Sequence, residues 1–125
     1  MEKKDLKPAG VFKYFEEICQ VPRPSKKEEK IIAYLKAFGA KHNLETKVDE
    51  AGNVLIKKPA TPGKENLQTV VLQSHIDMVC EKNNDVQHDF LTDPIETEID
   101  GEWLKAKGTT LGADNGIGVA TELAI

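Results

Sequence analysis

The feature that most constrains the fold is the stretch TVVLQSHID, Thr69 to Asp77, in which an uninterrupted apolar run leads to a histidine and an aspartate two residues apart. Such a run of bulky and β-branched residues is typical of a strand that is buried on both faces of a helix-covered sheet. Side chains in a strand repeat every two residues, so His75 and Asp77 are predicted to project to the same side. Open α/β sheets bind ligands outside the carboxyl ends of their strands, and the pair therefore marks a candidate site.

Helices and hairpins are predicted around this strand. Apolar spacing predicts helices over residues 11–19 and 28–39, and Ser25 with Glu28 matches a capping box before the second. A third helix is expected to follow Asp114. Alternating apolar and polar residues and tight turns predict two hairpins, over residues 44–57 and 95–107. The predicted fold class is α/β, a mixed twisted sheet packed by helices, in one compact piece.

The long segment between the His/Asp pair and the second hairpin has no convincing periodicity. Residues 81–94 are largely polar, and they are predicted to form a surface loop near the site. Loops of this length are often functional.

Composition excludes several classes of protein. The chain has 125 residues, 21 acidic against 17 basic, with no run of Lys and Arg, so no nucleic-acid partner is expected. No window approaches the roughly 18 apolar residues of a membrane span, so no membrane partner is expected either. Cys19 and Cys80 lie far apart, which favours reduced thiols and a cytoplasmic location over a disulfide framework.

Two interpretations stay open for each candidate site residue. His75 and Asp77 form either a structural hydrogen-bonded pair or a metal ligand with a carboxylate that fixes its tautomer. Asp114 is either a helix N-cap or an anionic ligand able to bridge cations, with Gly112, Gly116 and Gly118 letting the backbone approach another group or a substrate. A phosphate-binding loop is disfavoured, because GADNGIG lacks the Walker lysine and the spacing G-x-G-x-x-G.

At these residues a family resemblance becomes specific. SHIDMVCEK followed by GTTLGADNGIG resembles the metal-site segments of the aminoacylhistidine dipeptidases, the Xaa-His or peptidase D type, in the larger family of co-catalytic zinc peptidases and deacylases. VFKYFEEICQVPRPSKKEEKI is similar to the opening helices of that group, so the resemblance covers residues 6–125. Cys80 stands where the wider family commonly has a proline, which favours this subgroup.

The resemblance implies roles for three residues. His75 and Asp114 would bind metal, with Asp114 bridging two zinc ions or other divalent ions, and Asp77 would be a catalytic-site residue, the acidic side chain that orients His75. A two-metal site polarises the scissile carbonyl and supplies hydroxide at neutral pH. The implied substrate is a dipeptide, of Xaa-His type, and a homodimer of the full-length parent is compatible with the resemblance.

The resemblance also implies a domain assignment. Residues 1–125 would be the N-terminal portion of the metallopeptidase catalytic domain, with the general base, further ligands and an inserted lid domain outside them. The chain alone is then expected to be inactive. A related amidohydrolase and a non-catalytic domain that binds a ligand or partner remain the alternatives.

Overall fold

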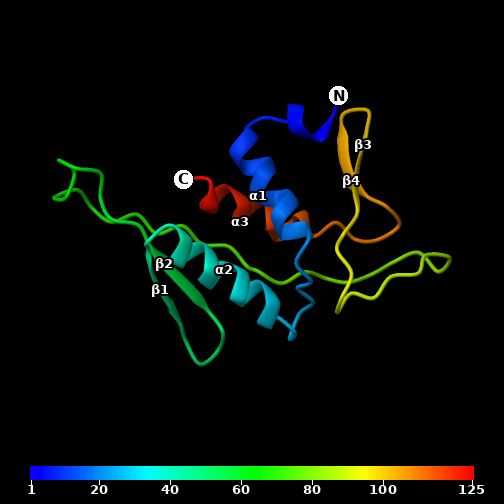
Figure 1. Ribbon diagram of the computed structural model, residues 1–125, viewed down its shortest axis with the longest axis horizontal. Helices are drawn as coiled ribbons and strands as arrows, with labels where there is room; N and C mark the ends of the chain where they lie inside the picture. Colours follow the sequence, from blue (N-terminus) through cyan, green and yellow to red (C-terminus); the bar gives the residue numbers. More distant parts are fainter. The chain divides into compact units, whose positions relative to one another are not determined.

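The computed structural model describes all 125 residues and has an α/β arrangement (Figure 1). After a short 3-10 helix, η1 (Lys3–Asp5), come three α-helices and two antiparallel pairs of strands. In chain order they are α1 (Ala9–Cys19), α2 (Glu29–Lys41), β1 (Glu45–Val48), β2 (Val54–Lys57), β3 (Thr97–Asp100), β4 (Trp103–Ala106) and α3 (Ala113–Leu123). The three predicted helices and both predicted hairpins are therefore confirmed.

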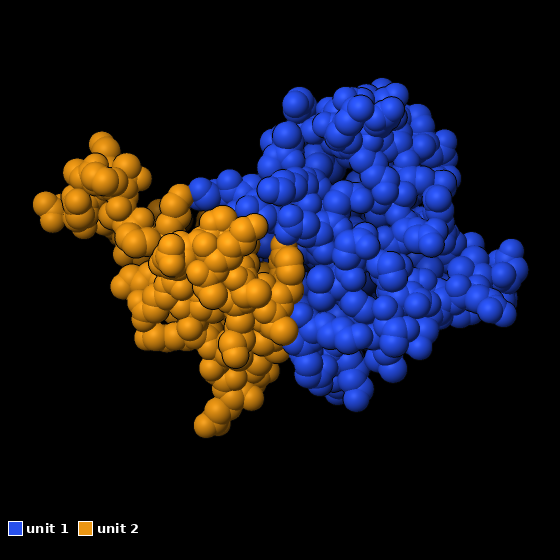
Figure 2. Space-filling model, in the orientation of Figure 1, with its two compact units in different colours: residues 1–31, 73–125 blue, residues 32–72 orange.

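The chain divides into two compact units, coloured separately in Figure 2. One unit contains residues 1–31 and 73–125, and the other contains residues 32–72. This differs from the single compact piece expected from the sequence.

In the first unit, α1 and α3 pack against each other (Figure 1). Apolar residues at helical spacing put one face of each helix into the interior. The backbone N–H of Ile95 donates to the carbonyl of Cys19, at 2.8 Å, which fixes the chain entering β3 against the end of α1. The buried apolar residues of this unit are Phe15, Ile18, Cys19, Ile31, Met78, Ile95, Val119 and Ala120.

The second unit contains most of α2 and the β1–β2 hairpin. The strands are antiparallel, with Thr46 opposite Ile56. Asp49 closes the turn, because its Oδ1 accepts the backbone N–H groups of Ala51 and Asn53, each at 2.9 Å. This is the local Asx-type bonding that favours aspartate in turns.

The prediction of a central strand over residues 69–77 is wrong. Residues 69–77 form no strand, and the side chains of Val70 and Val71 are 78% and 80% exposed rather than buried. A strand needs a hydrogen-bonding partner, and residues 69–77 pair with none of the four strands present, each of which is bonded only within its own hairpin. No mixed twisted sheet therefore forms, and the structure supports the coarser α/β class alone.

Residues 81–94 contain no helix or strand, apart from an isolated bridge between Lys82 and Thr109, as expected for a loop. None of the helices has the length and apolar character needed to cross a membrane.

Candidate metal centre

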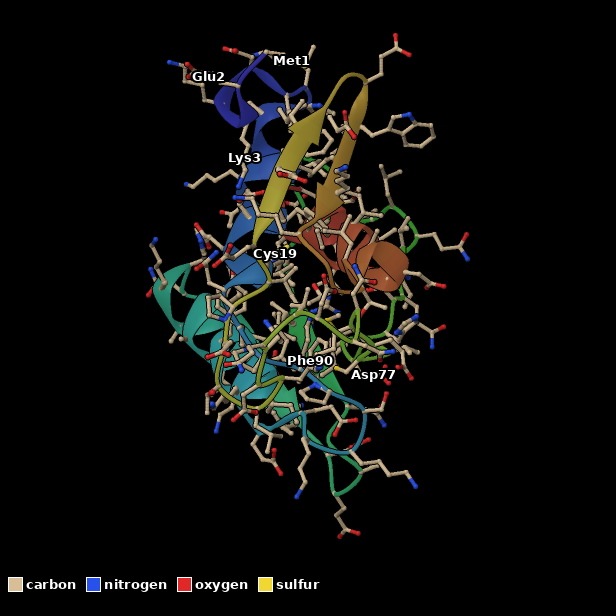
Figure 3. All side chains as sticks on the ribbon, turned by 90° about the vertical axis from the view of Figure 1, so that its right-hand side faces the viewer. Met1, Glu2, Lys3, Cys19, Asp77 and Phe90 are labelled. Carbon is tan, nitrogen blue, oxygen red and sulfur yellow. The ribbon has the colours of Figure 1, made fainter.

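His75 lies between two carboxylates in the first unit. Its Nδ1 is 3.1 Å from Oδ1 of Asp77, which is labelled in Figure 3, and its Nε2 is 2.9 Å from Oδ1 of Asp114. The imidazole is half exposed, and the Asp114 side chain is 95% exposed. The structure thus brings together all three residues singled out in the sequence, although His75 and Asp114 are 39 positions apart.

Hydrogen bonds set the charges of this cluster. The bond to Asp114, with a smaller contribution from Asp77, raises the pKa of His75 above its ordinary value. A hydrogen bond from Ser25, together with the interaction with His75, lowers the pKa of Asp77. When Nδ1–H donates to Asp77, the lone pair of Nε2 faces the Asp114 oxygen, and a proton or a cation has to lie between these two acceptors.

Ser25 is a site residue that the sequence interpretation assigned elsewhere. Its hydroxyl does not cap α2 but donates to Oδ2 of Asp77 at 2.5 Å. The bond leaves Oδ1 of Asp77 for His75, so both oxygens of this carboxylate have a partner. The capping-box prediction was wrong, because α2 begins at Glu29 rather than directly after Ser25, and the Ser25 hydroxyl bonds to a residue 52 positions away.

The capping interpretation of Asp114 is also wrong. Gly112, at φ 74°, is the N-cap residue of α3, and Asp114 has non-helical backbone angles (φ −92°, ψ 104°). Asn115 performs the capping instead, since its Oδ1 accepts the backbone N–H of Gly118 at 3.1 Å. The carboxylate of Asp114 is therefore directed to His75 instead of to the backbone of the helix.

The donor types of His75 and Asp114 fit a zinc ion, which takes imidazole nitrogen and carboxylate oxygen. A catalytic zinc usually has three protein ligands. No group of three His, Cys, Asp or Glu side chains in this chain could hold a metal ion. These two residues therefore fit part of a metal site and do not complete one.

No protein-family model matches the chain. The chain is 51% identical, over 99% of its length, to the cytosol non-specific dipeptidase of Escherichia coli, of which it covers 26%. It superposes with a TM-score of 0.95 and 54% identity on the crystal structure of aminoacylhistidine dipeptidase from Vibrio alginolyticus, covering 99% of this chain and 25% of that one.

A tripeptidase from Staphylococcus aureus shares the fold, with a TM-score of 0.73, 22% identity and coverage of 92% of this chain and 30% of that one. The chain spans about a quarter of the length of the two more similar proteins. Over nearly its whole length, the chain is homologous to that quarter of the cytosol non-specific dipeptidase and of aminoacylhistidine dipeptidase.

Proposed function

We propose that this chain supplies part of the zinc site of a dipeptide-hydrolysing enzyme, with His75 and Asp114 as metal ligands and Asp77 as the residue that orients His75. The observation that carries the proposal is the placement of the imidazole, with Nδ1 on Asp77 and Nε2 directed to Asp114. The homology to two dipeptidases supports the same chemistry.

The residues of the chain have separable tasks in this proposal. Nδ1–H of His75 donates to Asp77, which leaves the lone pair of Nε2 available to a metal ion and raises the basicity of Nε2. Ser25 keeps Asp77 ionised by donating to its second oxygen. Asp114 presents an exposed carboxylate that can bridge two ions. Bound zinc would supply Lewis-acid polarisation of the scissile carbonyl and activation of water.

The proposed substrates are dipeptides, with Xaa-His dipeptides tested first. The names of the two relatives describe different substrate ranges: the Escherichia coli protein is called a non-specific dipeptidase, and the Vibrio alginolyticus protein is called an aminoacylhistidine dipeptidase. The proposed location is the cytoplasm, supported by the word cytosol in one of those names and by the free thiols of Cys19 and Cys80.

The test uses the product of the complete reading frame, assayed for bound zinc per protomer and for hydrolysis of β-alanyl-histidine against acetylated amino acids. Asp114→Ala should lower zinc content and abolish hydrolysis. Asp77→Asn should keep most of the zinc and lose about 10–100-fold in activity, the usual cost of disturbing a residue that orients a ligand.

Four results would contradict the proposal. Full zinc content in Asp114→Ala would remove this residue from the site. Loss of zinc in Asp77→Asn to the same extent as in Asp114→Ala would make Asp77 a direct ligand. Hydrolysis of acetylated amino acids but not of dipeptides would favour the related amidohydrolase, and hydrolysis of neither would favour a non-catalytic binding role.

A further inference from the structure

We propose that Arg23 is a positioning residue that fixes the separation of His75 and Asp114, an inference that rests on the function proposed above. Arg23 is the only arginine among the chain's 17 lysine and arginine residues. It lies between two prolines and is 2% exposed, the largest of the fully buried side chains. Burial of a charged group is unfavourable unless hydrogen bonds compensate for the lost hydration, so the bonds of this guanidinium indicate its role.

The guanidinium bonds to both segments that carry the candidate ligands. Nη1 donates to the carbonyls of Ile76 and Asp77, each at 3.2 Å. Nη2 donates to the carbonyl of Gly112 at 2.6 Å. The first two carbonyls follow His75 directly in the chain, and the third precedes Asp114 by two residues. One planar group therefore connects the backbones of the two segments whose side chains meet.

The surroundings leave the guanidinium little room to move. A Cβ built on Gly112 would lie 2.6 Å from Nη2 and 2.8 Å from Sδ of Met78, and a Cβ on Gly116 would lie 2.6 Å from the same Nη2. Only glycine at these two positions lets the guanidinium fit against the start of α3. The backbone of Arg23 is held as well, since its carbonyl accepts the N–H of Met78 at 3.0 Å.

The chemistry requires arginine rather than lysine. No carboxylate hydrogen-bonds to Arg23, and its charge is balanced by carbonyl dipoles and by longer-range attraction to Asp77. Two nitrogens of the rigid fork reach in different directions at fixed angles, whereas the single ammonium of lysine cannot occupy both positions. Arg23→Lys keeps the charge and removes the bridge.

The experiment uses NMR on the metal-free chain, so that it does not depend on catalysis. The measured quantity is the NOE between the His75 ring and the Asp114 β-protons. We expect it in the wild type and in the control Ile18→Ala, which removes a buried side chain of α1 outside the site. It should be absent in Arg23→Lys, while NOEs within the α1–α3 core remain. An unchanged His75–Asp114 NOE in Arg23→Lys would overturn the proposal.

A second measurement covers the case in which Arg23→Lys does not fold. In wild-type chain labelled with ¹⁵N-arginine, a single guanidinium should give separate, slowly exchanging Nη signals with NOEs to the Gly112 α-protons. Averaged, rapidly exchanging signals would refute the bridge. Addition of zinc to the same wild-type sample tests the function separately: unmoved His75 signals count against zinc binding, while the NOEs still decide the role of Arg23.

Discussion

Two glycine-to-alanine substitutions should change stability in opposite directions, although both lie in helices of the same unit. In Gly116→Ala the new Cβ would lie 2.6 Å from Nη2 of Arg23 and 3.1 Å from Cε2 of Phe15. In Gly10→Ala the new Cβ would lie 3.6 Å from Cβ of Ala124, an ordinary van der Waals contact. The two variants add the same methyl group, so their difference isolates the space beside the helix.

The magnitude follows from two opposing effects. Alanine is better than glycine in a helix interior by about 0.8–1 kcal/mol. Overpacking a filled interior costs typically about 1–3 kcal/mol. The end of a long side chain usually moves aside cheaply, but Arg23 would have to break its 2.6 Å bond to Gly112 to do so. Gly116→Ala should therefore lower the free energy of unfolding by about 1 kcal/mol.

Gly10→Ala is the matched control. It lies at the second position of α1, where helix propensity counts for less, and it should raise the free energy of unfolding by about 0.5 kcal/mol. Urea denaturation followed by circular dichroism measures both changes. Equal stabilisation by the two substitutions would mean that the guanidinium does not fill the space beside Gly116, and would refute the packing on which the site geometry depends.

Three further predictions concern the purified chain of residues 1–125. Purified chain with added zinc should not hydrolyse dipeptides, since it offers two of the roughly three ligands of a catalytic zinc; turnover that survives removal of host peptidases would contradict this. NMR titration should give His75 a pKa above its ordinary value, and Asp114→Asn should lower that pKa. Because the folded-state pKa is raised, the stabilisation from this contact is present at low pH and lost as pH rises through that pKa. Val71→Lys should reduce self-association of the chain, measured by light scattering. Residues 68–74 are uncharged and make no backbone hydrogen bonds, so this segment can pair with another copy of the chain. Trp103→Lys should not reduce self-association, because Trp103 lies on a strand that is already paired.

The elements that could be predicted correctly from the sequence are those whose backbone hydrogen bonds join residues close together in the chain. α1 and α2 follow from apolar spacing within one segment, and each hairpin pairs two strands that are neighbours in the chain. The stretch from Thr69 to Asp77 has an equally clear apolar pattern but no partner strand in this chain. The apolar pattern indicates that the segment suits a buried strand, but whether a strand forms depends on a partner strand that the pattern does not specify.

The same distinction applies within the candidate site. His75 and Asp77 are two residues apart, so their contact was predictable from side-chain periodicity even though no strand forms. Ser25 carried a local capping signal, but α2 begins at Glu29 and the Ser25 hydroxyl bonds to a distant carboxylate. Arg23 carried no pattern at all, because one arginine between two prolines indicates an irregular backbone and nothing about what its side chain contacts.

The contact between His75 and Asp114 is the part that local patterns could not give, and it depends on packing distant from both. Asp114 can reach the imidazole because Asn115 caps the helix in its place. The carbonyl before it can meet the guanidinium because Gly112 and Gly116 have no side chains. Glycines that resemble a flexible loop in the sequence are therefore required for close packing, in which the buried guanidinium of Arg23 bonds to the backbones of the two segments that carry His75 and Asp114.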